Sequence, residues 1–240
     1  MSTEQPNRLP VLIDADDYNE VKTVLYDSVL RLWDVVDNLS RLQPRHSPEY
    51  HVSIFGSARV KPDTPKYAEI RSLAEQLVEM GCHVVTGGGP GLMQAANEGA
   101  AKAAPNDPDR SIGIRVELEF EQEVNPFVGE VYEHKTFFSR LHHFVLRSNG
   151  FVVVGGGIGT ALELLMIWQL LQVRKLYGTP LVLVGDMWHE LVEWADKHMI
   201  QTPPEYASPK DMEIPTCVKT IEEAVAIIRK DYDDWQAGIP

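Results

Sequence analysis

Three short glycine-containing stretches in this chain have the composition of phosphate-binding loops. Glycine lets the backbone approach a ligand closely and adopt positive φ. The first amides of a following helix have no intrahelical acceptor and carry partial positive charge, which favours an anion such as phosphate. The three stretches are Gly56-Ser57-Ala58-Arg59, Thr86-Gly87-Gly88-Gly89-Pro90-Gly91 and Gly155-Gly156-Gly157-Ile158-Gly159-Thr160. Each loop alone could be a tight strand-to-helix turn without a ligand, but three in one sheet predict a cleft.

The loop pattern favours a mononucleotide over a dinucleotide. The first loop is not GxGxxG, and the second strand ends in Thr86-Gly87 rather than in an acidic residue for a ribose hydroxyl. The chain has no GxxxxGK[ST] motif, which excludes a P-loop NTPase. The predicted phosphate-binding or substrate-binding residues are Gly56, Ser57, Gly88, Gly89, Gly156, Gly157, Gly159 and Thr160.

Glu163 and Arg140 are the side chains that could add chemistry to such a cleft. Glu163 follows Thr160 by three residues, so one interpretation is a capping box in which Thr160 is the helix N-cap. The other is a carboxylate that faces the ribose of a nucleotide whose phosphate lies at the helix start. Arg140 shares a helical stripe with His143 and Arg147, which by itself would suggest a solvated face.

An alternation of strands and helices must position these residues. Apolar runs predict strands at 51–57, 83–86, 111–116, 131–134, 151–154 and 180–184, and helical periodicity predicts helices at 67–80, 91–104, 136–149, 160–171, 188–198 and 220–232. This order predicts a doubly wound, Rossmann-like parallel sheet with ligands at the carboxyl ends of its strands. The Pro-rich segment 201–215 is interpreted as a lid or a partner contact.

The N-terminal region has a different pattern. Residues 1–15 read as a loose arm, and apolar residues at helical spacing predict a long amphipathic helix from Asp16 to Leu42, followed by a linker. We therefore expect two parts, an arm with its helix over 1–48 and a nucleotide-binding α/β domain over 49–240.

Composition limits the possible partners. A net charge of −13 argues against a nucleic-acid surface, and any phosphorylated substrate must be attracted by local donors. No run of 18 apolar residues predicts a membrane span, and the first fifteen residues do not resemble a secretory signal. Cys82 and Cys217 lack metal or disulfide spacing, so we expect a cytoplasmic protein without a cofactor or a metal.

The motif Gly156-Gly157-Ile158-Gly159-Thr160-Ala161-Leu162-Glu163, with Arg140 and the strand 151–154 before it, resembles the signature of the LOG family. This family comprises the cytokinin riboside 5'-monophosphate phosphoribohydrolases, and its longer members have a similar N-terminal helix. The resemblance covers residues 50–199 and includes the two earlier loops. It implies that Arg140 and Glu163 are catalytic, that the third loop binds phosphate, and that the protein is a dimer or larger. The expected reaction is hydrolysis of the N-glycosidic bond of a purine nucleoside 5'-monophosphate.

Two positions depart from the family signature. Gly155 stands where the family has proline, and Leu141 stands where it has lysine, which would remove a cation beside the site. Two alternatives therefore remain: a nucleotide- or molybdenum-cofactor-binding carrier without catalysis, and an interaction protein that uses the N-terminal helix. Many relatives carry an old lysine decarboxylase label, but no residue here indicates a pyridoxal phosphate lysine.

Overall fold

The computed structural model describes residues 21–30, 32, 48–117 and 123–238. The chain divides into two units, 1–43 and 44–240, which are described separately. In the first unit, Val21–Leu30 and Leu32 are helical, within the predicted helix. The rest of that helix, the arm at 1–15 and residues 44–47 of the linker lie outside the described residues.

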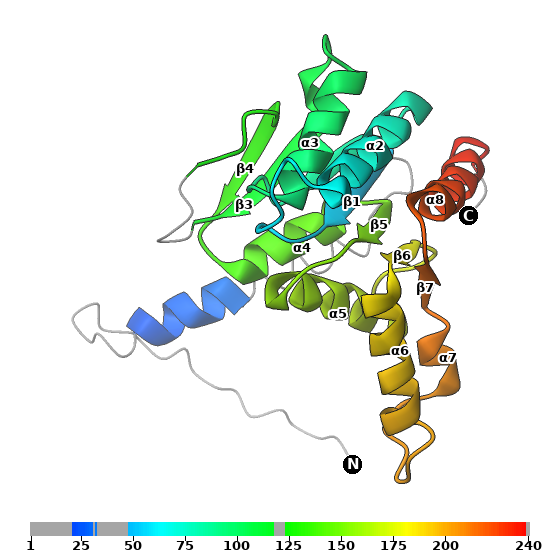
Figure 1. The fold of residues 1–240 in the computed structure, drawn as a ribbon. Coiled ribbons are helices and arrows are strands. Elements are labelled where there is room, and N and C mark those ends of the chain that lie inside the picture. The colour runs from blue at the N-terminus through cyan, green and yellow to red at the C-terminus, as the bar shows by residue number, and fades with distance from the viewer. Residues whose placement is uncertain (1–20, 31, 33–47, 118–122, 239–240) are drawn as a thin grey trace. The chain divides into compact units, whose positions relative to one another are not determined.

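The second unit is built on a seven-stranded parallel sheet in the order β4-β3-β2-β1-β5-β6-β7 (Figure 1). Its strands are β1 (His51–Phe55), β2 (His83–Thr86), β3 (Ser111–Val116), β4 (Glu130–His134), β5 (Gly150–Val153), β6 (Leu181–Val184) and β7 (Pro215–Val218). The predicted α/β fold is thus confirmed. The central strands are buried on both sides, as expected for parallel strands covered by helices on both faces.

Seven helices belong to this unit in the described part of the chain. They are α2 (Pro65–Met80), α3 (Leu92–Ala103), α4 (Phe137–Arg147), α5 (Ile158–Gln172), α6 (Asp186–Met199), α7 (Pro209–Met212) and α8 (Ile221–Gln236). Residues of α2, α3 and α8 form one buried core with Val52, Val84 and other strand residues. Residues of α4, α5 and α6 form a second core on the other face, with Phe55, Phe151 and Trp188. None of the described helices is long and apolar enough to cross a membrane.

The segment 201–215 differs from its interpretation as a lid. Residues 209–212 form α7, and Pro215 begins β7, a strand that pairs with β6 at the edge of the sheet. The strand escaped prediction because it is short, half-exposed and begins with proline, a residue that sheets accept at edge positions. Whether the exposed residues 201–208 contact a partner stays a prediction.

The chain order places a topological switch point between β1 and β5. From β1 the sheet grows through β2, β3 and β4 on one side, and from β5 it grows through β6 and β7 on the other. The loops that follow β1 and β5 are joined by a hydrogen bond from Ser57 N to Gly155 O of 3.0 Å. The switch point is where such sheets bind ligands, and here it brings two of the glycine loops together.

Candidate active site

A cleft of about 520 Å³ lies at the carboxyl ends of the strands, where the three glycine loops meet. Arg140 and Glu163 line it together with most of the predicted binding residues. These are Gly56, Ser57, Gly88, Gly89, Gly157, Gly159 and Thr160. In the described chain, Gly156 is the predicted site residue that does not line this cleft.

The third loop leads into a helix whose start has no side-chain cap. Helix α5 begins at Ile158 with Gly157 as its N-cap, and its first intrahelical bond runs from Ala161 N to Gly157 O at 2.9 Å. The prediction that the helix starts at Thr160 was therefore wrong, and so was the capping box with Glu163. The amides of residues 158–160 are left for a ligand, as a phosphate site at a helix start requires.

Gly156 has a packing role in the loop, and its predicted contact with substrate stays a prediction. A Cβ atom at this position would lie 2.2 Å from Oγ1 and 2.4 Å from Cβ of Thr160. The loop therefore closes directly against the first turn of α5, and only glycine allows this approach. Gly155, where the family has proline, would meet nothing within 4 Å.

We expect Gly156→Ala to lower the free energy of unfolding by about 1–3 kcal/mol, because the added methyl group must displace Thr160. The displaced first turn should also bind AMP more weakly. Gly157→Ala is the matched control for the free energy of unfolding, since a Cβ there meets nothing within 4 Å. Urea unfolding of the two variants measures the first effect, and isothermal titration of Gly156→Ala against wild type measures the second. Equal unfolding free energies for Gly156→Ala and wild type would contradict this packing role.

Arg140 and Glu163 form a shielded ion pair at the wall of the cleft. Arg140 Nη1 lies 2.9 Å from Glu163 Oε1, and the two side chains are only 12% and 10% exposed. Arg140 Nε donates to the carbonyl oxygen of Ile114 at 2.9 Å, and the guanidinium lies over the ring of Phe144. A Cβ at Gly87 would lie 2.5 Å from Arg140 Nη2, so this glycine makes room for the guanidinium. The arginine is thus held from three sides and fixes the carboxylate in turn.

Burial dominates the ionisation of Glu163. Removal of the carboxyl from water raises its pKa above the ordinary value, and the charge and hydrogen bond of Arg140 offset part of that shift. A carboxylate with a raised pKa exchanges a proton more readily near neutral pH than an exposed glutamate does. This is a property of groups that act as general acids or bases.

The second glycine loop is held by a buried polar network that the sequence analysis missed. Thr86 Oγ1 accepts a hydrogen bond from Gly88 N at 2.9 Å and donates to Asn97 Oδ1 at 2.6 Å. Asn125 Nδ2 donates to both Asn97 Oδ1 and Gly89 O at 3.0 Å. The loop can thus hold Gly88 at a φ of +70°. Asn97 is fully buried, and an asparagine on the apolar face of a helix was the signal available in the sequence.

The polar stripe of α4 faces strands and not solvent. His143 Nδ1 lies 2.9 Å from His134 Nε2, and Arg147 forms an ion pair of 2.9 Å with Glu130. Of the three stripe residues, Arg140 alone lines the cleft. Leu141, where the family has lysine, is 7% exposed and is not among the residues that line the cleft.

Two further arginines line the cleft. Arg59 follows β1 and Arg115 lies near the end of β3, where Arg115 also forms an ion pair of 3.4 Å with Glu133. They supply local positive charge in a chain whose net charge is −13. The sequence predicted that local donors must attract an anion but did not name these two arginines as donors, although Arg59 lies in the first glycine loop and Arg115 near the end of a predicted strand.

Comparison with known proteins places the chain in a family. Residues 93–228 match the family described as "Possible lysine decarboxylase", which is more than half of the chain. The pyrimidine/purine nucleotide 5'-monophosphate nucleosidase of Escherichia coli K12 is 32% identical over 126 residues. That alignment covers 50% of this chain and 28% of the E. coli protein, so the chain spans less than a third of that relative.

Solved structures share the fold at low identity. The molybdenum cofactor carrier protein of Chlamydomonas reinhardtii is 19% identical with a TM-score of 0.57, covering 77% of this chain and 99% of that one. The molybdenum cofactor binding protein of Rippkaea orientalis is 18% identical with a TM-score of 0.53, covering 76% and 96%. The parallel sheet and the glycine loops are consistent with the family match over residues 93–228. The chain therefore belongs to the LOG-like family described as "Possible lysine decarboxylase".

Proposed function

We propose that this protein hydrolyses the N-glycosidic bond of nucleoside 5'-monophosphates and releases the free base and ribose 5-phosphate. The observation that carries the proposal is the position of the Arg140–Glu163 pair in the same cleft as the uncapped start of α5. Glu163 lies three residues beyond Thr160, which is about 4.5 Å along the helix axis. A phosphate at the helix start would therefore bring its own ribose toward this carboxylate.

Each part of the cleft would have a defined role in that reaction. The amides of residues 158–160 would bind the phosphate and orient the sugar. As the bond between C1' and the base nitrogen breaks, positive charge develops on the sugar, and the Glu163 carboxylate would stabilise it. As the oxygen of the attacking water bonds to C1', the carboxylate would accept a proton from this water and release it to solvent, from which the departing base takes up one proton. Arg140 would hold the carboxylate in this position.

The cleft and the surface beside it also suggest a substrate class and an assembly. We propose that a purine nucleotide, with a cytokinin ribotide as one candidate, occupies the α/β domain of residues 49–240. We further propose a homodimer or a higher homo-oligomer that forms over exposed apolar side chains beside the cleft. On α4 and α5 these are Phe137, Phe138, Ile158, Leu162 and Leu165. Sedimentation velocity of the full chain measures this assembly.

A product assay across nucleoside monophosphates tests the activity. The chain is incubated with AMP, GMP, CMP, UMP and isopentenyladenosine monophosphate, and free base and ribose 5-phosphate are measured together. Equal amounts of the two products from at least one nucleotide support the proposal. Intact nucleotides throughout would refute it. A thermal shift with AMP but no product would then favour a carrier without catalysis.

The rate of this reaction should depend on pH through Glu163. We expect kcat/KM for AMP to fall as the pH is lowered through the pKa of Glu163, because a protonated carboxyl no longer stabilises positive charge or accepts a proton. Since burial raises this pKa, the fall should begin above the ordinary glutamate value of about 4.3. A pH–rate profile, with circular dichroism at each pH to confirm folding, checks this. A rate independent of pH throughout the folded range would contradict it.

A further inference from the structure

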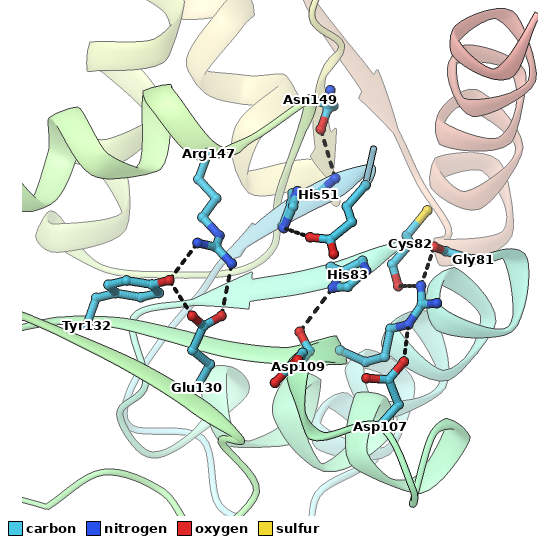
Figure 2. A network of polar contacts seen from close by, with 12 residues as sticks. His51, Gly81, Cys82, His83, Asp107, Asp109, Glu130, Tyr132, Arg147 and Asn149 are labelled. Carbon is cyan, nitrogen blue, oxygen red and sulfur yellow. Dashed lines mark hydrogen bonds and ion pairs between the residues drawn. The ribbon is translucent and has the colours of Figure 1, made fainter. Parts of the chain in front are cut away.

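A second cluster of side chains lies at the amino ends of the strands, at the edge of the sheet opposite the cleft (Figure 2). His51 and His83 are the first residues of β1 and β2 and pair with each other in the parallel register. Paired residues of parallel strands point to the same face, and the two rings lie 4.9 Å apart between centroids. The length of β1 separates this cluster from the cleft by roughly 15 Å.

His51 is buried without the hydrogen bonds that a buried imidazole requires. Its side chain is 5% exposed, and in the described chain neither ring nitrogen has a hydrogen-bond partner. Its Nε2 lies 3.5 Å from Glu49 Oε2. This distance is too long for a good hydrogen bond, but two ligands of one tetrahedral Zn²⁺ ion, each bonded at about 2.0–2.1 Å, lie about 3.3 Å apart.

His83 is oriented as metal-binding histidines are. Its Nδ1 lies 3.0 Å from the carbonyl oxygen of Asp109. Figure 2 marks this contact with a dashed line. Because a carbonyl oxygen can only accept, Nδ1 is the donor in this contact, and Nε2 is the ring nitrogen that could bind a metal ion. A hydrogen bond from the second ring nitrogen to a carbonyl is the usual way in which proteins fix the tautomer and direction of a metal ligand.

The charges around the cluster permit a cation. Arg147 and Arg110 carry positive charge near His51. Arg147 is balanced by Glu130 and Arg110 by Asp107, each in an ion pair of 2.9 Å. Glu49 adds a negative charge beside His51. One ligand atom from each of Glu49, His51 and His83 lies within 4.8 Å of the others.

We propose that Glu49, His51 and His83 bind one divalent transition-metal ion of the Zn²⁺ class, with water completing its coordination. Two histidines and one carboxylate form a donor set that suits Zn²⁺ and not Mg²⁺ or Ca²⁺, which prefer oxygen ligands alone. The ion would connect the segment before β1 to the first residues of β1 and β2. Its role is structural, because the cluster lies at the opposite edge of the sheet from the cleft.

Metal binding by the full chain without a polyhistidine tag tests the proposal. The protein is stripped with a chelator and dialysed against Zn²⁺, and bound metal is measured by mass spectrometry and by competition with a chromophoric chelator. We expect one Zn²⁺ per chain and a higher midpoint of thermal unfolding with the ion. Glu49→Gln and His83→Gln should each weaken the affinity at least about tenfold. Glu49 is exposed, so its variant should fold even if the His83 variant does not.

His189→Gln is the matched control. His189 lies 3.2 Å from Glu193 on the surface of α6, so this variant removes an exposed histidine beside a carboxylate and should leave the affinity unchanged. Substoichiometric binding, or equal affinity in wild type and Glu49→Gln, would overturn the metal site. These readouts do not depend on nucleotide hydrolysis, so the two proposals fail separately.

Discussion

Glu163→Gln is expected to reduce kcat for nucleotide hydrolysis by about 10³-fold or more and to change the Kd for AMP by less than about threefold. Glutamine keeps the size of the side chain and can still accept a hydrogen bond from Arg140. It cannot stabilise a positive sugar by charge or take a proton from water. Phosphate binding depends on the backbone amides of α5, which the substitution leaves in place.

Glu190→Gln provides the matched control for this loss. Glu190 is an exposed glutamate of α6 and is not among the residues that line the cleft, so its variant should retain full activity. Kinetics under saturating AMP give kcat, and isothermal titration gives Kd. Wild-type turnover in Glu163→Gln would remove the carboxylate from the mechanism and leave it a role in packing against Arg140.

Arg140→Ala is expected to lower kcat/KM by about 10²-fold, a typical cost of losing one fixed charged group in an active site. It should also move the acid limb of the pH–rate profile to higher pH. The reason is that Arg140 lowers the pKa of Glu163 while burial raises it, so without the guanidinium the pKa rises further. A purely structural role for Arg140 would not produce this shift.

Arg140→Lys should give an intermediate rate. Lysine keeps the positive charge but has no planar fork, and it cannot contact both Ile114 O and Glu163 Oε1 in the same geometry. Arg147→Lys is the control. Arg147 lies on the same stripe of α4 as Arg140, but it pairs with Glu130 of β4 and does not line the cleft. A pH–rate profile of Arg140→Ala that superimposes on wild type would show that Arg140 does not tune Glu163.

The alternation of strands and helices along the chain could be predicted from the sequence because the signals are local. Apolar runs such as Phe151–Val154 and the glycines that follow them indicate strands and turns without knowledge of the fold. For the same reason the loop positions at the carboxyl edge were predicted correctly. The edge strand β7 was missed because its four residues, beginning with Pro215, form no such run.

The start of α5 was decided by packing and not by local preference. Glycines are poor helix formers, so the sequence suggested that the helix begins only after Gly159. In the structure it begins at Ile158, because Gly156 packs against Thr160 and brings the loop onto the first turn. Gly156, a predicted phosphate-binding residue, is not among the residues that line the cleft.

The sequence alone determined the α/β class and the three glycine loops, and it singled out Arg140 and Glu163 as candidate site residues, since these inferences depend on local pattern and on a specific motif. Only the tertiary structure brings Arg140 Nη1 to 2.9 Å from Glu163 Oε1, with both side chains largely shielded from solvent. It also places the rings of His51 and His83 next to each other. Both pairs join residues from different elements. Their distances follow from strand register and helix packing, which no spacing along the chain specifies.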